Sequence, residues 1–388
     1  MQIFDEIERL DDHGSEYGEG KFAYLNRSGR TAVGSVREKI NEWVANYPEH
    51  HQTPLVARIR SDNDVTHESA LFELLLHEAL LRSGVTVEAI EPQLTHTDRS
   101  PDFLIRLATG ERMYLEATLT TGISDSDRRA KRLLDAAIQA VDSVRSDDFA
   151  LEARFTGVPT RPIRLRRVRT AVQQWLAGLD YEDTKRLWDS SAHRRKRPQW
   201  DYNEDGLSIS LWPIPRNNRV AIGRGIGLQH GGGWSRTPGA ALRQSIEKKA
   251  VRYGELDLPF IVAVNGLDHH GDEYDILAAL LGNEVVSFRV GGDAADATTD
   301  RTWDGAWISP DHRPRNQRVS AVLVFDGLAL WTPKKRGLLV LNPWADRPVT
   351  TPPLDVDRLL PFEAGFRREE GRSYGEMVGI GNNWPTDD

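Results

Sequence analysis

Two acidic side chains in the first third of this sequence could together bind a metal ion. Asp102 follows a proline just before the apolar run 103–107, and Glu116 lies inside a second apolar run, 113–117. The turn residues between the runs predict a β-hairpin, and a three-residue loop ending at a left-handed Gly110 places Asp102 opposite Glu116. Two carboxylates on one face of a sheet repel each other unless a cation lies between them. A hard divalent ion with oxygen ligands is the natural candidate.

A strongly apolar helix is predicted just before this hairpin. It runs from a candidate N-cap, Thr66, to a terminating Gly84. Leucine, phenylalanine and alanine leave it almost no polar face, so the helix is predicted to be buried. Glu73 and Glu78 lie within it, and a buried carboxylate needs a partner. A strand at 85–90 then leads toward the hairpin.

A second helix, predicted at 238–253, carries a basic residue on its apolar side. The stripe contains Leu242, Ile246 and Tyr253, and Lys249 falls on the same stripe. One interpretation is that the lysine stem lies along the core while its amine reaches water. The other is that the amine is buried, in which case it must find an acidic partner, because an unpaired buried ammonium is costly.

This order of elements resembles the PD-(D/E)XK nuclease superfamily, which has the restriction-endonuclease-like fold. The matching residues are Phe72-Glu73-Leu74 in the first helix, Pro101-Asp102, and Leu115-Glu116-Ala117-Thr118. The resemblance implies that Asp102 and Glu116 bind Mg²⁺ (or Mn²⁺) and that Glu73 is an auxiliary acid. It also implies that the chain hydrolyses phosphodiester bonds of DNA, in defence or repair.

One position departs from the pattern of this family. Thr118 stands where the family has its catalytic lysine, and it shares a strand face with Glu116 because side chains alternate along a strand. A threonine cannot place positive charge beside a transition state that gains negative charge. Another element would then supply the lysine, with Lys249 as the candidate and Lys248 as the neighbouring alternative. We expect the amine of Lys249 to lie within reach of Glu116, with Tyr253 beside it.

The composition restricts the class of protein. A chain of 388 residues with 39% hydrophobic and 28% charged residues is typical of a soluble protein with two or three compact units. The absence of cysteine excludes disulfides and thiolate metal sites. The first residues lack the apolar region of a signal peptide, and no apolar run is long enough to span a membrane. We therefore expect a cytoplasmic protein with no membrane partner.

A basic segment contrasts with the net charge of −8, which alone argues against a nucleic-acid partner. Residues 154–200 contain 12 Lys or Arg and 4 Asp or Glu. A local basic surface is what a phosphate backbone requires, so we expect the segment 161–197 to line one side of a cleft over the hairpin. The alternative is a solvated helix face and a charged loop. The residues predicted to bind DNA are Arg164, Arg166, Arg167, Arg169, Arg195 and Lys196.

The predicted fold class is α/β, with a mixed central β-sheet flanked by helices. The predicted parts are an N-terminal extension at 1–58, a restriction-endonuclease-like core at 59–268 with a basic insertion at about 120–236, and a C-terminal α/β extension at 269–388. Strands of this last part, at 319–325 and 338–341, are expected to extend the same sheet. Residues 185–206 and the Gly-rich stretch 222–239 are predicted as loops, and residues after about 366 as frayed.

Three functions are consistent with the sequence. The leading hypothesis is a Mg²⁺-dependent DNA endonuclease. The second is a nucleic-acid-binding module that lost catalysis, which Thr118 in place of lysine would allow. The third is a protein-interaction module that never meets nucleic acid, in keeping with the acidic net charge. Each is compatible with a homodimer.

Overall fold

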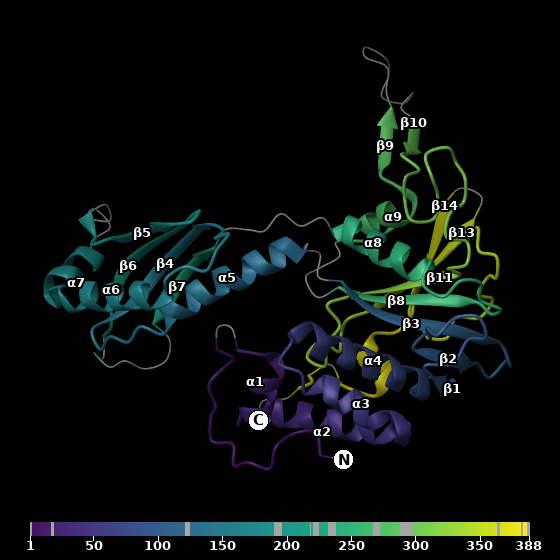
Figure 1. Ribbon diagram of the computed structural model, residues 1–388, viewed down its shortest axis with the longest axis horizontal. Coiled ribbons are helices and arrows are strands. Elements are labelled where there is room, and N and C mark those ends of the chain that lie inside the picture. Colours follow the sequence, from purple (N-terminus) through teal and green to yellow (C-terminus); the bar gives the residue numbers. More distant parts are fainter. Residues whose placement is uncertain are drawn as a thin grey trace. The chain divides into compact units, whose positions relative to one another are not determined.

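The chain divides into two compact units (Figure 1). The computed structural model describes residues 2–16, 19–120, 125–189, 196–217, 219, 225–231, 238–266, 272–287, 298–362, 365–381 and 383–385. The first unit comprises Met1–Asp12, Gly20–Gly122 and Arg236–Asp388, and the second comprises His13–Glu19 and Ile123–Ser235. The first unit thus includes most of the predicted N-terminal extension and all of the predicted C-terminal extension. The insertion predicted at about 120–236 covers nearly the same residues as the second unit.

An eight-stranded mixed sheet forms the centre of the first unit. Its strands, in spatial order, are β1 (Thr86–Ile90), β2 (Phe103–Arg106), β3 (Arg112–Thr120), β8 (Phe260–Gly266), β11 (Ala321–Asp326), β12 (Gly337–Leu341), β13 (Asp357–Phe362) and β14 (Gly365–Glu369). β8 runs parallel to both β3 and β11, and every residue of β8 is buried. A strand covered on both faces reads as a continuous apolar run, as FIVAV does. The mixed sheet and its extension by β11 and β12 confirm the prediction.

Helices cover both faces of this sheet (Figure 1). One face carries α1 (Lys21–Arg27), α2 (Thr31–Asn46), α3 (Glu49–Ile59), α4 (Asp64–Arg82) and α10 (Tyr374–Val378), and their side chains form one core with Phe103 and Leu115. The other face carries α8 (Pro238–Ala250) and α9 (Glu273–Leu281), which pack on Tyr114 and Val262. A two-stranded ribbon, β9 (Glu284–Ser287) with β10 (Thr298–Arg301), follows α9.

Helix α4 is buried along most of its length, as its sequence predicts. It begins two residues earlier than predicted, because the side chain of Asn63, and not that of Thr66, accepts the first free amides. Gly84 follows the C-cap with φ of +75°, a conformation that glycine adopts without strain. Glu73 and Glu78 both have the partners that a buried carboxylate needs.

The hairpin of β2 and β3 has the predicted register. Phe103 pairs with Leu115 and Arg106 with Arg112. The amide of Leu107 donates to the carbonyl of Glu111 at 2.8 Å, and Gly110 has φ of +87°. A three-residue loop with a left-handed third residue therefore sets the pairing of the two strands.

Within its described residues, the second unit is a four-stranded sheet with three helices. The strands, in spatial order, are β5 (Trp200–Glu204), β6 (Leu207–Pro215), β4 (Phe149–Gly157) and β7 (Ile226–Gly231), and the helices are α5 (Asp125–Asp142), α6 (Leu165–Ala177) and α7 (Tyr181–Asp189). Its core contains Ile138, Leu151, Val168 and Ile209. The loop predictions for 185–206 and 222–239 were wrong where α7, β5, β7 and the start of α8 lie. The sequences of β5 and β7 are polar or Gly-rich and do not by themselves indicate strands. They form strands because β5 pairs with β6 and β7 pairs with β4.

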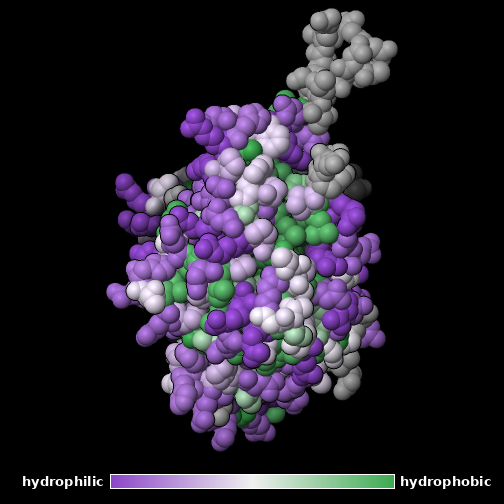
Figure 2. All heavy atoms as spheres, turned by 90° about the vertical axis from the view of Figure 1, so that its right-hand side faces the viewer, coloured by the Kyte–Doolittle hydropathy of each residue, from purple (hydrophilic) through white to green (hydrophobic). Residues whose placement is uncertain are grey.

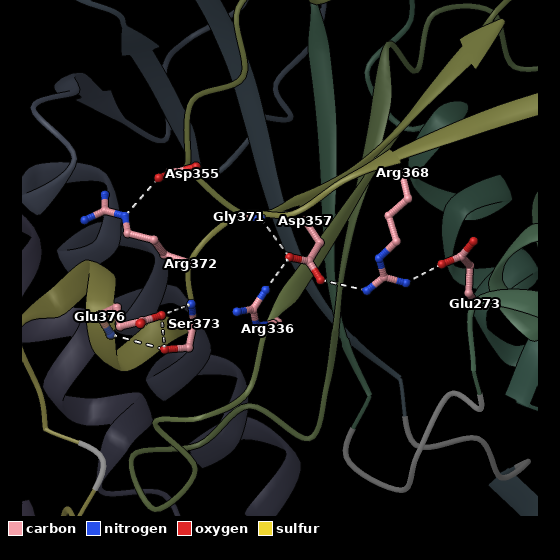
Figure 3. A network of polar contacts seen from close by, with 9 residues as sticks. All are labelled: Glu273, Arg336, Asp355, Asp357, Arg368, Gly371, Arg372, Ser373 and Glu376. Carbon is pink, nitrogen blue, oxygen red and sulfur yellow. Dashed lines mark hydrogen bonds and ion pairs between the residues drawn. The ribbon is translucent and has the colours of Figure 1, made fainter.

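Residues 366–381 and 383–385 are ordered, so the prediction of a frayed end was wrong for them. Asp357 of β13 is 2% exposed and accepts hydrogen bonds from Arg336, Arg368 and the amide of Gly371 (Figure 3). Tyr374 of α10 is 1% exposed, and its hydroxyl donates to the carbonyl of Leu75 at 3.0 Å. These contacts with distant residues hold a segment whose own sequence is polar.

The surface seen in Figure 2 is mostly hydrophilic, with hydrophobic residues in smaller patches between polar ones. Among the described residues, no helix combines the length and the apolar character needed to cross a membrane.

Candidate active site

Asp102 and Glu116 lie on the same face of the sheet, as predicted. Leu104 of β2 and Tyr114 of β3 both pack in the core beneath α8. Asp102 lies two residues before Leu104 and Glu116 two residues after Tyr114, so strand alternation directs them to that face. The Asp102 carboxylate accepts a hydrogen bond from the amide of Ala117 through Oδ2 at 2.6 Å. This bond ties the first acid to the strand that carries the second.

Glu116 is the buried centre of the site. It is 2% exposed. Its Oε1 forms an ion pair with the amine of Lys249, and its Oε2 accepts a hydrogen bond from the hydroxyl of Tyr253 at 2.5 Å. Nη1 of Arg252 lies 3.9 Å from Oε1. The expected approach of Lys249 and Tyr253 to Glu116 is confirmed, whereas Lys248 is exposed.

Burial and Glu116 together raise the pKa of the Tyr253 phenol above its ordinary value. The phenol therefore stays protonated and acts on Glu116 as a hydrogen-bond donor. Tyr253 is 1% exposed, and its ring meets that of Phe260 edge to face at a centroid distance of 5.7 Å. These contacts fix the donor, and the donor fixes the orientation of the Glu116 carboxylate.

The electrostatics of Asp102 show that the acids are close enough to interact. Burial, then the carboxylates of Glu116 and Glu73, raise the pKa of Asp102 well above its ordinary value. The amide of Ala117 and the amine of Lys249 act in the opposite direction, but more weakly. The metal-free protein thus disfavours the ionised form of Asp102, and a bound cation would reverse that preference.

Glu73 enters the site from α4 with both oxygens already engaged. It is 6% exposed. Tyr47 donates to Oε1 at 2.6 Å, and Arg58 donates to Oε2 at 2.7 Å and to Oε1 at 3.0 Å. The pKa of Tyr47 is raised, first by burial and then by the carboxylates of Glu73 and Asp102. Asp102 therefore lies within electrostatic reach of the Tyr47 hydroxyl as well.

Arg58 and Tyr47 were missed by the sequence analysis. They come from α3 and from the residue that follows α2. The only signal that could have found them is the requirement of a buried Glu73 for a partner. That requirement states that a donor exists but does not say which of the chain's many arginines supplies it.

The oxygen donors at this site fit a hard divalent cation. In the part of the chain that the structure describes, no group of three or more His, Cys, Asp or Glu side chains has metal-binding geometry. A pair of carboxylates is nevertheless sufficient for Mg²⁺, which keeps several waters and also binds substrate phosphate. Each carboxylate oxygen has two acceptor positions, so Glu116 keeps capacity beside its two hydrogen bonds. Metal–oxygen distances of about 2.0–2.1 Å predict a separation of roughly 4–5 Å between the Asp102 and Glu116 carboxylates.

Thr118 lies on β3 in register with Val264 and is half-buried. It shares the strand face of Glu116. The position of the family's lysine is thus filled by a neutral side chain, while the ammonium of Lys249 reaches Glu116 from α8.

The predicted DNA-binding residues belong to the second unit. Arg164, Arg166, Arg167 and Arg169 are exposed at the start of α6, and Lys196 is exposed as well. Arg195 lies outside the described residues. Arg164 and Arg167 lower the raised pKa of Tyr202 on β5, so they lie near that strand. Arg166 and Arg169 instead border a groove between α5 and α6. The expectation that this segment lines a cleft over the hairpin stays a prediction.

Comparison with known proteins identifies no relative of this chain. No protein-family model, no curated protein and no solved structure matches it.

Proposed function

We propose that this protein is a metal-dependent nuclease that hydrolyses phosphodiester bonds of DNA. The observation that carries the proposal is the convergence of Asp102, Glu116 and Lys249. Two of these residues come from one hairpin and the third from a helix more than a hundred residues later. Oxygen donors for a cation and an ammonium beside them are what the transition state of phosphodiester hydrolysis needs.

Asp102 and Glu116 would hold Mg²⁺ (or Mn²⁺). The bound ion supplies Lewis-acid charge and a water molecule of lowered pKa. Lys249 places positive charge where the non-bridging oxygens of the scissile phosphate gain negative charge. Tyr253 holds the orientation of the Glu116 carboxylate through its hydrogen bond. Glu73, fixed by Arg58 and Tyr47, adds negative charge that favours the cation.

The order of elements supports a restriction-endonuclease-like core. Helix α4 with Glu73 precedes β1 and the β2–β3 hairpin, and α8 with Lys249 precedes β8, which runs parallel to β3. This is the order on which the resemblance to PD-(D/E)XK nucleases rests, with the lysine moved from the strand to a helix.

A cleavage assay with matched variants tests the proposal. Supercoiled plasmid is incubated with Mg²⁺ or Mn²⁺ and the wild type, Glu116→Gln or Lys249→Met. Glu88→Gln, a carboxylate on β1 paired with Arg106 and Arg112, and Lys248→Met are the controls. We expect metal-dependent cleavage that both site variants abolish and both controls keep. Equal cleavage by Lys249→Met and wild type would show that the lysine has no catalytic role.

The second candidate is a nucleic-acid-binding module on the same fold that no longer cleaves. Thr118 favours it, because the position that carries the family's lysine is neutral in this chain. DNA retention that falls with salt, without cleavage under any divalent metal, would support this candidate. A chain that neither binds nor cleaves DNA would leave only the protein-interaction module.

A further inference from the structure

A groove in the second unit runs between α5 and α6. Its volume is about 320 Å³. Ala136, Gln139 and Ala140 of α5 and Ser143, which follows this helix, line one side, and Leu165, Arg166 and Arg169 of α6 line the other. Residues three and four apart share one face of a helix, so each wall is a continuous strip along its helix. The α5 strip is mostly small and partly apolar, and the α6 strip carries two arginines beside Leu165.

The charges of the two groove arginines are not matched by the described residues. Both are exposed, and among the described residues no carboxylate forms an ion pair with either. Asp135, which lies next to Ala136 on α5, is paired with Lys131 at 3.0 Å. The two guanidinium groups therefore keep their hydrogen-bond donors for another molecule.

Other arginines of the same unit have internal partners. Arg197 donates to the carbonyl of Trp188 at 2.7 Å and lies 4.1 Å from the centre of its ring. Arg154 lies over the ring of Trp212 at 5.5 Å. Arg164 and Arg167 are exposed as well, and they differ from Arg166 and Arg169 in that they do not border the groove.

We infer that this groove is a binding site for the sugar–phosphate backbone of nucleic acid, in which Arg166 and Arg169 contact phosphate groups. A guanidinium presents a planar fork of donors that matches phosphate oxygens. Ala136 and Ala140 add small apolar lining that a sugar can contact. The volume is at the lower end of the roughly 300–1,000 Å³ of small-molecule sites, which suits a nucleotide unit better than a bare anion.

Contacts to phosphate carry no sequence information, so binding through them should show no sequence preference. The inference rests on the proposed function for the class of its ligand. It adds that the second unit anchors the substrate and that two of the six predicted basic residues do so in a defined groove.

Binding of labelled DNA by the full chain tests the groove. In EDTA, so that no hydrolysis occurs, fluorescence anisotropy with a 20-nucleotide DNA duplex gives the Kd at several salt concentrations. We expect Arg166→Gln/Arg169→Gln to weaken binding at least tenfold and to reduce the slope of log K against log salt by about 2, because each phosphate contact contributes about 0.9. The matched control is Arg164→Gln/Arg167→Gln, which should change the Kd less than threefold.

A second variant tests the groove without removing an arginine. Gln139→Glu places a carboxylate in the groove at an exposed position, where it should not affect folding. We expect it to weaken binding several-fold. Gln174→Glu makes the same charge change at an exposed position of α6 outside the groove and should leave the Kd unchanged. An RNA of the same sequence, used as competitor, shows which nucleic acid the groove prefers.

The outcomes separate this inference from the proposed nuclease. One outcome is that the wild type binds DNA, the Arg166→Gln/Arg169→Gln and Gln139→Glu variants bind it more weakly, and no metal-dependent cleavage occurs. This outcome supports the groove and overturns the nuclease. Cleavage with unchanged binding by these variants overturns the groove and leaves the nuclease. Equal loss from both arginine pairs, or no effect of Gln139→Glu, also overturns the groove as a defined site.

Discussion

The charged side chains of the candidate site and those of the groove differ in burial and in pairing. In the first unit the charges of the candidate site are buried and paired, as Glu116 is with Lys249 and Glu73 is with Arg58. In the second unit Arg166 and Arg169 are exposed and form no ion pair with a described residue. Buried charges must be matched within the protein because desolvation is costly. Exposed charges stay solvated and can bind a ligand. An arginine such as Arg58 therefore has a structural partner in the first unit, whereas Arg166 and Arg169 are free to bind a ligand in the second.

The largest effect should come from breaking the buried pair. Lys249→Met leaves Glu116, which is 2% exposed, with Tyr253 as its remaining strong partner. We expect a loss of about 3 kcal/mol in the free energy of unfolding, measured by urea denaturation, because an uncompensated buried carboxylate is costly.

A double-mutant cycle isolates the cause of this loss. Lys249→Met/Glu116→Gln removes the stranded charge together with its partner, so it should recover most of the lost stability. Lys248→Met, on the exposed side of α8, should stay within about 0.5 kcal/mol of wild type. A double variant as unstable as Lys249→Met would mean that the lysine acts through packing and not through charge.

The second effect concerns the partner of Glu73. Arg58→Met removes two hydrogen bonds and leaves Glu73 with Tyr47. Because Arg58 is 38% exposed and water can partly replace it, we expect a smaller loss, about 2 kcal/mol by thermal or urea unfolding. Arg112→Met breaks an ion pair with Glu88 at the surface and is the control, expected within about 0.5 kcal/mol.

Asp102→Asn should stabilise the metal-free protein. Because the pKa of Asp102 is raised in the folded state, ionising this acid costs stability as pH rises from its ordinary pKa near 3.8 through the folded value. We expect the variant to gain about 1 kcal/mol at neutral pH, a rise in Tm of roughly 2–4 °C, and no gain below pH 3.

Metal should reverse the advantage of this variant. Added Mg²⁺ should raise the Tm of the wild type and leave Asp102→Asn unchanged, as measured by differential scanning fluorimetry. Mg²⁺ that shifts neither protein, or shifts both equally, would argue against a cation at Asp102.

The smallest effect on stability is expected in the groove. Arg166→Gln/Arg169→Gln should change the free energy of unfolding by less than about 0.5 kcal/mol while weakening DNA binding. The change in DNA-binding affinity relative to the change in the free energy of unfolding measures how far the groove charges differ from the buried pairs of the first unit. A large loss of stability would show that these arginines have partners within the fold.

Local periodicity in the sequence was sufficient to place the main residues of the candidate site. The odd loop length fixed which residue faces Asp102, and the helical stripe of α8 fixed which lysine turns inward. Both depend on interactions between near neighbours along the chain, and those interactions follow from residue spacing alone.

Only the tertiary structure decided the rest. The choice of Arg58 and Tyr47 as partners of Glu73 depends on how α2 and α3 pack against α4. β5, β7 and α10 adopt regular structure through contacts with other segments: the two strands pair with neighbouring strands, and α10 contacts Leu75 through Tyr374. Polar and Gly-rich segments carry little intrinsic preference for one conformation, so their structure is supplied by the surfaces they meet. The sequence by itself therefore determined the chemistry that could gather at the hairpin, and the packing determined which charges were buried with a partner and which were left free.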